Sequence, residues 1–341
     1  MPSINFSYDH DGDIHIDPTR TERRKRRQGR RPHRQEKVSP TEVIASIVDT
    51  PDGEAYFSFS YDASRHERKW IIDSLGNFYD QKWVNDVLRL VKGGKEASVY
   101  LCSSNPELAA EYIAAKVYRP RQFRSLKNDH TYREGRTVLD EDGNQITDDG
   151  MWHAIQKRTA YGRQLMHTSW IEHEFQALEM LHSAGADVPT PYARGDNAIL
   201  MSYIGAPGLP APTLQEVQLP LEEAQRLFRK ILRNIELMLA HDIIHGDLSA
   251  YNILYWEGEI TLIDFPQIVS PRTNINAYRI FERDLIRVCE YFARQGVSSR
   301  PRQIAARLWS AYHHPLKPSL DPKYLDEENE SDRQAWDRDH P

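Results

Sequence analysis

Three oxygen-bearing side chains stand along one aliphatic stretch in the C-terminal half of the chain. Asp247 and Asn252 lie five positions apart in HGDLSAYN, and Asp264 follows 17 positions after Asp247, at the end of the strand-like EITLID. Magnesium prefers hard oxygen ligands, so Asn252 and Asp264 could hold it against the phosphates of ATP. Asp247 could then orient an attacking hydroxyl or water. The pattern indicates phosphoryl transfer, with Asp247 as the catalytic residue.

A phosphoryl-transfer site also needs a cation for the α- and β-phosphates and a carboxylate that holds this cation. Lys116 in AAKVY fits the first role, because a lysine in a half-buried strand needs a partner. Two glutamates of the helical stretch SWIEHEFQALEMLHS could be that partner. Glu174 shares a helix face with aliphatic residues, whereas Glu172 lines up with polar residues and is expected to face solvent. We therefore predict that Lys116 pairs with Glu174.

The elements that must position these residues change in type along the chain. From Val87 through KGGKEASVYLC to YIAAKVY, the pattern predicts a hairpin and a third strand, and AILMSYIG predicts a further strand. Helical periodicity marks residues 169–183, 221–242 and 281–296. Strands thus come first and helices later. This order predicts an α+β fold with two lobes, joined near Ser202–Gly205.

Residues 119–168 separate Lys116 from the helix that carries Glu174. They are charged and rich in turn formers, so we expect a long flexible loop. Within them DEDGNQITDD resembles a calcium loop, as does DHDGDIHID near residue 10. Both lack the Gly and Glu that such loops need at their sixth and twelfth positions, so we exclude calcium binding.

The net charge of −6 conceals a strong asymmetry. Residues 20–37 hold ten Lys or Arg and two Glu, which leaves −14 on the rest of the chain. This arm should be disordered and could bind the phosphates of RNA or DNA without sequence preference; a solvated tail and a nuclear targeting signal remain open. Residues 321–341, with eight acidic and three basic residues, predict a second poorly ordered tail.

Composition places the chain among soluble globular proteins, with 39% hydrophobic and 28% charged residues. Its apolar runs are too short to span a membrane, and its polar start is no signal peptide, so we expect a cytoplasmic location. Its two cysteines are far apart and form no Cys-x-x-Cys pair, which argues against disulfide and zinc sites.

From Glu67 to Gly296 these motifs resemble the RIO family of atypical serine/threonine protein kinases, most closely its first subfamily. GGKEASVY is similar to the family's nucleotide loop, AAKVY to its strand lysine, EHEF to its helix glutamate and LMSYIGAPGLPAPTL to its hinge. HGDLSAYNIL and IDFPQIV are similar to its catalytic and metal loops. The resemblance implies a kinase-like fold with a small antiparallel-sheet N-lobe and a mostly helical, truncated C-lobe.

By this resemblance Asp247, Lys116 and Glu174 are the catalytic set, and Asn252 and Asp264 bind Mg²⁺, for which Mn²⁺ could substitute. Asp284 would brace the catalytic loop. The resemblance also implies an ATP site lined by Gly93, Gly94, Lys95, Glu96, Ala97, Ser98, Val99, Ala114, Lys116, Met201, Ser202, Ile204 and Leu254.

The resemblance divides the chain into five parts. They are a basic arm (1–40), an extension (41–66), an N-lobe with the long loop (67–201), a C-lobe (202–320) and an acidic tail (321–341).

Two features depart from ordinary protein kinases. No Ala-Pro-Glu follows Asp264, and only 77 residues remain after it, so there is little room for an activation loop. Pro266 follows Asp-Phe where a flexible Gly is usual, which should hinder flipping of the metal-binding Asp264.

The sequence therefore predicts a Mg-ATP-dependent serine/threonine kinase that can phosphorylate itself and can also hydrolyse ATP. Its protein substrate stays open. Two alternatives remain: a small-molecule phosphotransferase of the aminoglycoside or choline kinase type, and an ATP-driven switch that binds ribosomal RNA or a ribosomal precursor through residues 20–37.

Overall fold

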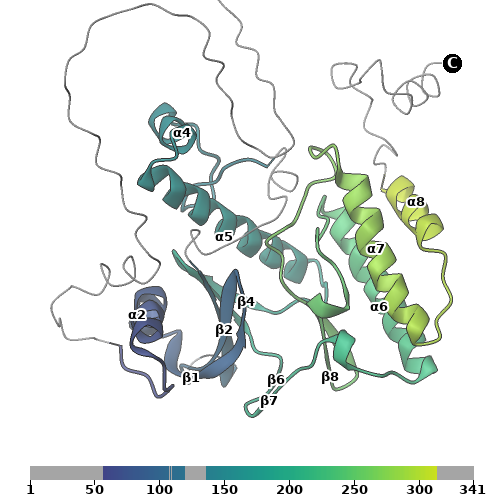
Figure 1. Cartoon of the computed structure of the whole chain (residues 1–341), viewed down its shortest axis with the longest axis horizontal. Helices are drawn as coiled ribbons and strands as arrows, with labels where there is room; N and C mark the ends of the chain where they lie inside the picture. Colours follow the sequence, from purple (N-terminus) through teal and green to yellow (C-terminus); the bar gives the residue numbers. More distant parts are fainter. Residues whose placement is uncertain (1–56, 107, 109, 120–135, 313–341) are drawn as a thin grey trace, which may run out of the picture. The chain divides into compact units, whose positions relative to one another are not determined.

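The computed structural model describes residues 57–106, 108, 110–119 and 136–312 (Figure 1). The predicted basic arm, most of the extension 41–66 and the acidic tail lie outside the described residues. The fold is α+β, as predicted, with an antiparallel sheet first and most of the helices after it. Within the described ranges, no helix has both the length and the apolar character needed to cross a membrane, and the cytoplasmic location stays a prediction.

Five antiparallel strands form the sheet of the N-terminal part. They are β1 (Val84–Gly93), β2 (Ala97–Ser104), β3 (Tyr112–Tyr118), β4 (Pro191–Arg194) and β5 (Ala198–Ser202). Their order is β1-β2-β3-β5-β4. The predicted hairpin, third strand and later strand are therefore present, whereas the short edge strand β4 was not anticipated.

The two faces of this sheet pack on different helices. Ile113, Ala115 and Val117 of β3 lie in the core shared with α2 (Arg65–Asp80). Side chains alternate along a strand, so the residues between them face the other way, and Tyr118 packs there on α5 (Ala160–Ser183). Lys116 shares this second face. Alternation along β3 is thus what directs the lysine towards the helix that carries Glu174.

The prediction of a long flexible loop at residues 119–168 is wrong for much of this range. Residues Asp149–Gln156 form α4, and α5 begins at Ala160, nine residues before the predicted helix start. Both helices have N-caps: Asp148 accepts a hydrogen bond from the N–H of Met151, and Thr159 accepts one from Gly162. These polar caps lie in a charged stretch, where they looked like turn formers. Residues 120–135 lie outside the described part of the chain.

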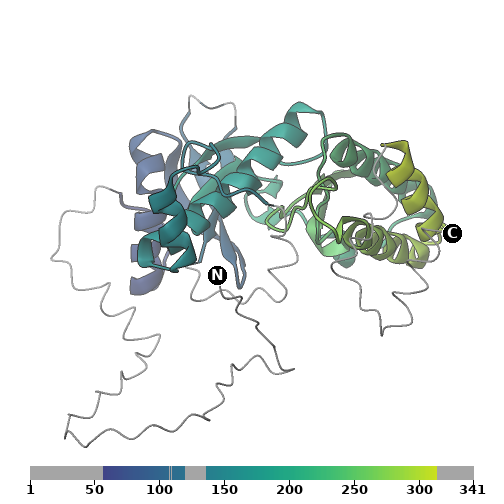
Figure 2. The same ribbon diagram turned by 90° about the horizontal axis from the view of Figure 1, so that it is seen from above.

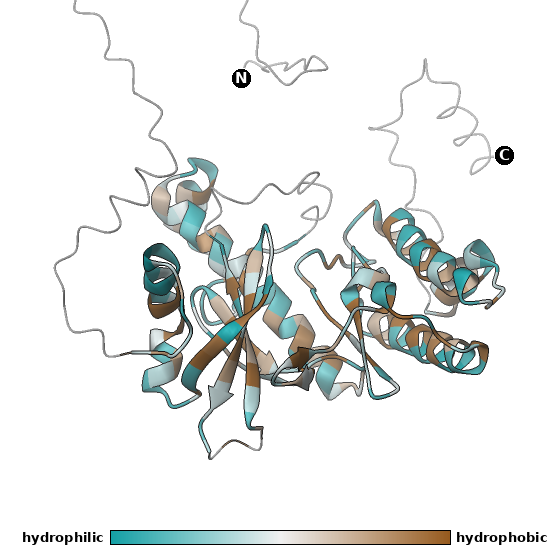
Figure 3. Cartoon of the chain, turned by 60° about the horizontal axis from the view of Figure 1, so that its bottom comes forward, coloured by the Kyte–Doolittle hydropathy of each residue, from teal (hydrophilic) through white to brown (hydrophobic). Residues whose placement is uncertain are grey.

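The C-terminal part is mainly helical. It contains α6 (Leu221–Ala240), α7 (Ala277–Arg294) and α8 (Pro301–Ala311), and α7 and α8 lie side by side in both views (Figures 1 and 2). Apolar stripes alternate with polar ones around these helices (Figure 3), and their apolar sides form one buried core. Tyr278 and Phe281 of α7 contact Trp309 of α8, with ring centroids 5.3 and 5.6 Å apart.

Several short elements complete this part. They are β6 (Gly205–Ala206), β7 (Leu209–Pro210), η2 (Leu214–Glu216), η3 (Ala250–Asn252), β8 (Ile253–Trp256) and β9 (Glu259–Leu262). β8 and β9 form a hairpin in which Ile253 pairs with Leu262. Asn252 therefore precedes one strand at the end where the other strand leads to Asp264. The N–H of Ile263 donates to the carbonyl of Asn252 at 3.0 Å, which ties the two segments together.

Candidate active site

A buried ion pair connects β3 to α5. Lys116 Nζ donates to Glu174 Oε1, and the hydroxyl of Tyr118 donates to Glu174 Oε2 at 2.8 Å. The Lys116 and Glu174 side chains are only 10% and 5% exposed. Each group therefore depends on its partners for the hydrogen bonds that burial takes from water. The structure brings together the two residues that the sequence analysis paired.

The reason given for choosing Glu174 over Glu172 is wrong in one respect. Glu172 does not face solvent, because its side chain is also only 5% exposed. It pairs with Arg194 of β4 and accepts a hydrogen bond of 2.8 Å from Gln176. Burial raises the pKa of Glu172, and Arg194 opposes this shift. Helix α5 is covered on more than one side, so a simple split into apolar and polar faces could not assign its two glutamates.

Lys116 has a second carboxylate partner, which comes from the C-terminal part. Its Nζ lies 2.6 Å from Asp264 Oδ1. Desolvation would raise the pKa of Asp264, but attraction to the Lys116 ammonium outweighs it and holds this pKa below its usual range. Burial likewise would lower the pKa of Lys116, and Asp264 and Glu174 together raise it instead. At neutral pH this lysine is therefore charged and bound to both acids.

His245 connects the loop of Asp247 with the loop of Asp264. It is almost fully buried, its Nε2 donates to the carbonyl of Ile263 at 3.1 Å, and its ring lies 4.8 Å from that of Phe265. Its Nδ1 accepts from the N–H of Asp247 at 3.3 Å. The histidine thus holds two loops in register and does not point at the reacting groups.

Gly246 lets the chain turn between His245 and Asp247. Its φ is +82°, and a Cβ at this position would overlap the carbonyl oxygen of Gln267. Behind it, the Arg283 guanidinium donates to the carbonyl of Gly246 and also to Asp284 Oδ1 at 2.8 Å. Burial raises the pKa of Asp284, and Arg283 opposes this shift. Asp284 and Arg283 therefore support the loop from α7.

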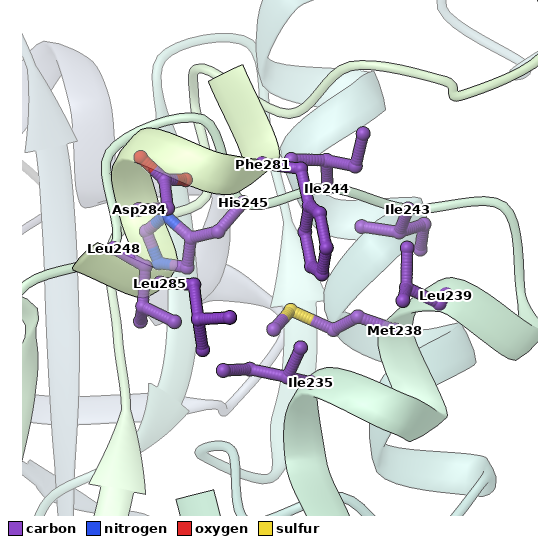
Figure 4. A pocket seen from close by; sticks show the side chains of 10 residues that line it. All are labelled: Ile235, Met238, Leu239, Ile243, Ile244, His245, Leu248, Phe281, Asp284 and Leu285. Carbon is purple, nitrogen blue, oxygen red and sulfur yellow. The ribbon is translucent and has the colours of Figure 1, made fainter. Parts of the chain in front are cut away.

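A small apolar pocket lies below this loop. Figure 4 shows His245 and Asp284 at one end of it and apolar side chains of α6, α7 and the segment that follows α6 along the rest. Neither Asp247 nor Asp264 lines the pocket. It belongs to the apolar core that supports the loop and offers no phosphate site.

Asp247 is held at both carboxylate oxygens. Asn252 Nδ2 donates to the Asp247 main-chain carbonyl at 2.8 Å and to Oδ2 at 3.3 Å. Arg287 Nη1 of α7 donates to Oδ1 at 2.8 Å. The sequence analysis missed Arg287, because a basic residue on an amphipathic helix 40 positions away carries no signal of its partner.

The donor chemistry of Asn252 and Asp264 fits a magnesium ion. The Asn252 amide nitrogen is engaged with Asp247, so its oxygen is directed elsewhere. Among the described residues, neither Asn252 Oδ1 nor Asp264 Oδ2 has a hydrogen-bond partner. Asp264 has a φ of +72°, and its side chain is 43% exposed. Two oxygens without partners on linked segments are the kind of ligand that Mg²⁺ uses together with substrate phosphates.

The residues expected around adenine come mainly from the sheet face of Lys116. Val99 pairs with Lys116, and Ala114 pairs with Met201, so these four side chains share one face. Leu254 of β8 bridges to Thr213.

Ser98 and Ser202 differ from the other expected ATP-site residues. The Ser98 side chain is 3% exposed on the opposite face, and Ser202 Oγ accepts from the N–H of Thr190 at 2.9 Å. These two residues could meet a nucleotide only through their main chain. Ile204 follows β5, and its carbonyl accepts from the N–H of Ala211 at 3.1 Å.

The loop between β1 and β2 is short. Gly93 ends β1, and the N–H of Gly94 donates to the carbonyl of Ala97 at 2.9 Å. A Cβ on Gly94 would lie 2.7 Å from that carbonyl oxygen, so the turn needs glycine. Lys95 lies in the turn, and the Glu96 carbonyl accepts from the N–H of Arg119 at 2.8 Å. The expected nucleotide loop is therefore a tight hairpin turn beside the face of Lys116.

The sequence of this chain is similar to those of a known protein family. The family model described as the RIO domain matches residues 98–304 of this chain. RIO-type serine/threonine-protein kinase Rio1 of Methanocaldococcus jannaschii is 28% identical over 234 residues, covering 68% of this chain and 76% of the relative. Serine/threonine-protein kinase RIO1 of Chaetomium thermophilum is 28% identical over 240 residues, covering 65% of this chain but only 42% of the relative. The solved Cydia pomonella granulovirus kinase PK-1 aligns with 57% of this chain and 58% of its own, at a TM-score of 0.35 and 12% identity.

Proposed function

Because this chain belongs to the RIO family, we propose that it is a serine/threonine protein kinase that uses Mg-ATP, phosphorylates itself and can also pass the phosphoryl group to water. The observation that carries the proposal is the double contact of Lys116, with Glu174 on one side and Asp264 on the other. A charged lysine beside a metal-binding carboxylate is the arrangement that positions the phosphates of ATP for transfer.

The remaining residues supply the acceptor side. Asp247 binds the acceptor hydroxyl and takes its proton, and Asn252 holds Asp247 through its amide nitrogen, so its amide oxygen would be the metal ligand. Asn252 and Asp264 would hold the metal, which would supply positive charge against the phosphates. The same constellation accepts water in place of a hydroxyl, which gives ATP hydrolysis.

The short connection after Asp264 favours self-phosphorylation and hydrolysis as main activities. Only 12 residues separate Asp264 from the start of α7 at Ala277, and main-chain hydrogen bonds tie this connection at Ile268, Val269 and Asn274. A platform for a separate peptide has little room there. Binding to ribosomal RNA as an ATP-driven switch is the second candidate, and hydrolysis stimulated by RNA would favour it.

The first prediction compares the two aspartates. Asp264→Asn removes one negative metal ligand, so hydrolysis and self-phosphorylation should fall together, with weaker Mg-ATP binding. Asp247→Ala leaves the metal ligands in place, so nucleotide should still bind while transfer drops by a factor on the order of 10² to 10⁴. Labelled ATP, followed separately as free phosphate and as protein-bound label, measures both activities, and titration with labelled ADP measures binding.

Chemical stability of the label identifies the acceptor. Acid-stable label on Ser or Thr supports the kinase, whereas acid-labile label cleaved by hydroxylamine indicates phosphoaspartate and favours the switch. Full Ser/Thr self-phosphorylation by the Asp247→Ala protein would show that the catalytic assignment is wrong.

A further inference from the structure

Arg287 stands at the open side of the proposed catalytic carboxylate. Its Nη1 lies 2.8 Å from Asp247 Oδ1, and α7 carries it there from three positions beyond Asp284, which is buried under the same loop. Residues three positions apart lie on the same side of a helix. Asp284 of α7 therefore supports the loop, and Arg287 on the same side reaches the Asp247 carboxylate.

This contact contributes little to folding. The Arg287 and Asp247 side chains are 40% and 43% exposed, and solvent screens an ion pair of such exposure, so it adds little to stability. The loop already has a buried support, because Arg283 donates to the Gly246 carbonyl and to Asp284. Support of the loop therefore does not explain why Arg287 contacts Asp247.

Most of the Arg287 guanidinium is available for a ligand. Its described contact uses Nη1 alone, and within the described ranges Nε and Nη2 have no hydrogen-bond partner. Lys116, a second cation of the site, is already bound to two carboxylates. A planar guanidinium can donate to a carboxylate with one nitrogen and to phosphoryl oxygens with the others.

Distance permits both contacts at once. A hydroxyl held by Asp247 within about 3 Å, and about 3–3.5 Å from the phosphorus that it attacks, leaves the phosphoryl oxygens roughly 4–6 Å from the carboxylate. A guanidinium that already binds this carboxylate lies within that range.

We propose that Arg287 is a catalytic residue that binds the transferred phosphoryl group while it holds Asp247; this rests on the proposed function. The acceptor oxygen forms a bond to the γ-phosphorus, and the bond to the β–γ bridging oxygen breaks, leaving its electron pair on ADP. The acceptor proton passes to Asp247, and Arg287 keeps all its protons. Its charge stabilises the equatorial oxygens during the transfer, the role that arginine plays in other phosphoryl-transfer enzymes.

The test uses Arg287→Ala and Arg287→Lys in the full chain, with Arg294→Ala as the matched control. Arg294 lies seven positions later on α7 and contacts the Tyr291 ring and Gln215, away from Asp247. We expect Arg287→Ala to lower kcat by about 10²-fold or more with KM for ATP nearly unchanged, and Arg287→Lys to recover part of the loss. Arg294→Ala should match the wild type.

A binding readout separates this role from mere support of the loop. ADP with Mg²⁺ and aluminium fluoride mimics the phosphoryl group in transfer and should bind the wild type much more tightly than ADP with Mg²⁺ alone. Arg287→Ala should lose at least about tenfold of this gain while its affinity for ADP stays the same. Equal gains in the variant and wild type, with kcat unchanged, would overturn the proposal. A wild type that shows neither transfer nor a fluoride-dependent gain would overturn the proposed function with it.

Discussion

Two buried glutamates, two positions apart on one helix, have different partners and should have different importance. Glu174 binds Lys116 and Tyr118, whereas Glu172 binds Arg194 and Gln176. The two glutamate side chains are equally buried, at 5% exposure each. Only the pair of Glu174 and Lys116 is connected to Asp264, because Lys116 contacts Asp264 as well.

The prediction at this scale is a matched comparison of Glu174→Gln with Glu172→Gln. Glutamine can still accept from its neighbours, so both proteins should fold and lose at most about 1–2 kcal/mol of stability, measured by urea unfolding. Glu174→Gln should lower phosphoryl transfer by about 10- to 10²-fold, because Lys116 loses a charged anchor and is positioned less well. Glu172→Gln should keep near wild-type transfer. Equal losses in both variants would contradict the role given to Glu174.

Residue types and spacing correctly indicated several side chains that meet in the site, but they did not give all the contacts or the burial of each side chain. Asp247, Asn252 and Asp264 could be grouped by their types and spacing along an aliphatic stretch, and Lys116 because it interrupts an apolar strand. The solvent-facing position expected for Glu172 was wrong, since tertiary cover of α5 decides burial. Arg287 was missed because its partner is set by the packing of α7 and not by any local pattern.

At the scale of elements, the segment before α4 docks on two parts of the site. The Arg136 guanidinium donates to the carbonyls of Pro266 and Ile268, just after Asp264, and His173 Nε2 of α5 donates to the carbonyl of Thr137 at 2.8 Å. Burial, and to a smaller extent the charge of Arg136, lower the pKa of His173 to about 4 despite this hydrogen bond. The segment is thus coupled to the protonation of one histidine.

The sign of this coupling gives a prediction. The folded pKa of about 4 lies below the unfolded value of 6.5, so stability is complete above pH 6.5 and is lost as the pH falls towards 4. Between pH 7.5 and 5.0 the wild type should therefore lose about 1–2 kcal/mol more than His173→Gln, measured by urea unfolding. His182→Gln serves as the control, because His182 is exposed on the same helix and bonds Thr190. Parallel losses in the wild type and His173→Gln would rule out this linkage.

Element prediction from the sequence was best where side-chain periodicity was simple. The strands with β-branched alternation and the amphipathic helices α6 and α7 were located, with boundaries within a few residues. Helices α2, α4 and α8 were not, because their stretches of 16, 8 and 11 residues mix aromatic, charged and turn-forming residues. The N-caps Asp148 and Thr159 were the available signal for α4 and for the start of α5.

At the scale of the whole molecule, charge is divided between the ends and the rest. Residues 20–37 carry ten basic and two acidic side chains against a net charge of −14 elsewhere. We propose that this arm binds RNA through its phosphates. Such binding releases counterions, so the logarithm of the binding constant falls linearly as the logarithm of the salt concentration rises.

Deletion of residues 20–37 should weaken RNA binding and reduce its salt dependence by several units of slope, at about 0.7 per phosphate contact for single strands. The slope is measured by fluorescence anisotropy of a labelled single-stranded RNA at salt concentrations from about 50 to about 300 mM. An arm with the same composition in scrambled order should restore both affinity and slope. A slope that survives the deletion would assign RNA binding to another surface.

The two acidic partners of Lys116 have a consequence for what can enter the site. Before any nucleotide arrives, Lys116 is bound to Glu174 and Asp264, and Arg287 is bound to Asp247. A bare polyphosphate would meet the negative charge of Asp264 there, and Lys116 could bind it only by loosening its contact with a carboxylate. A divalent cation that arrives with the polyphosphate would offset this repulsion, and Asp264 would be a ligand for it. We therefore propose that this site selects the polyphosphate together with its divalent ion over the free anion.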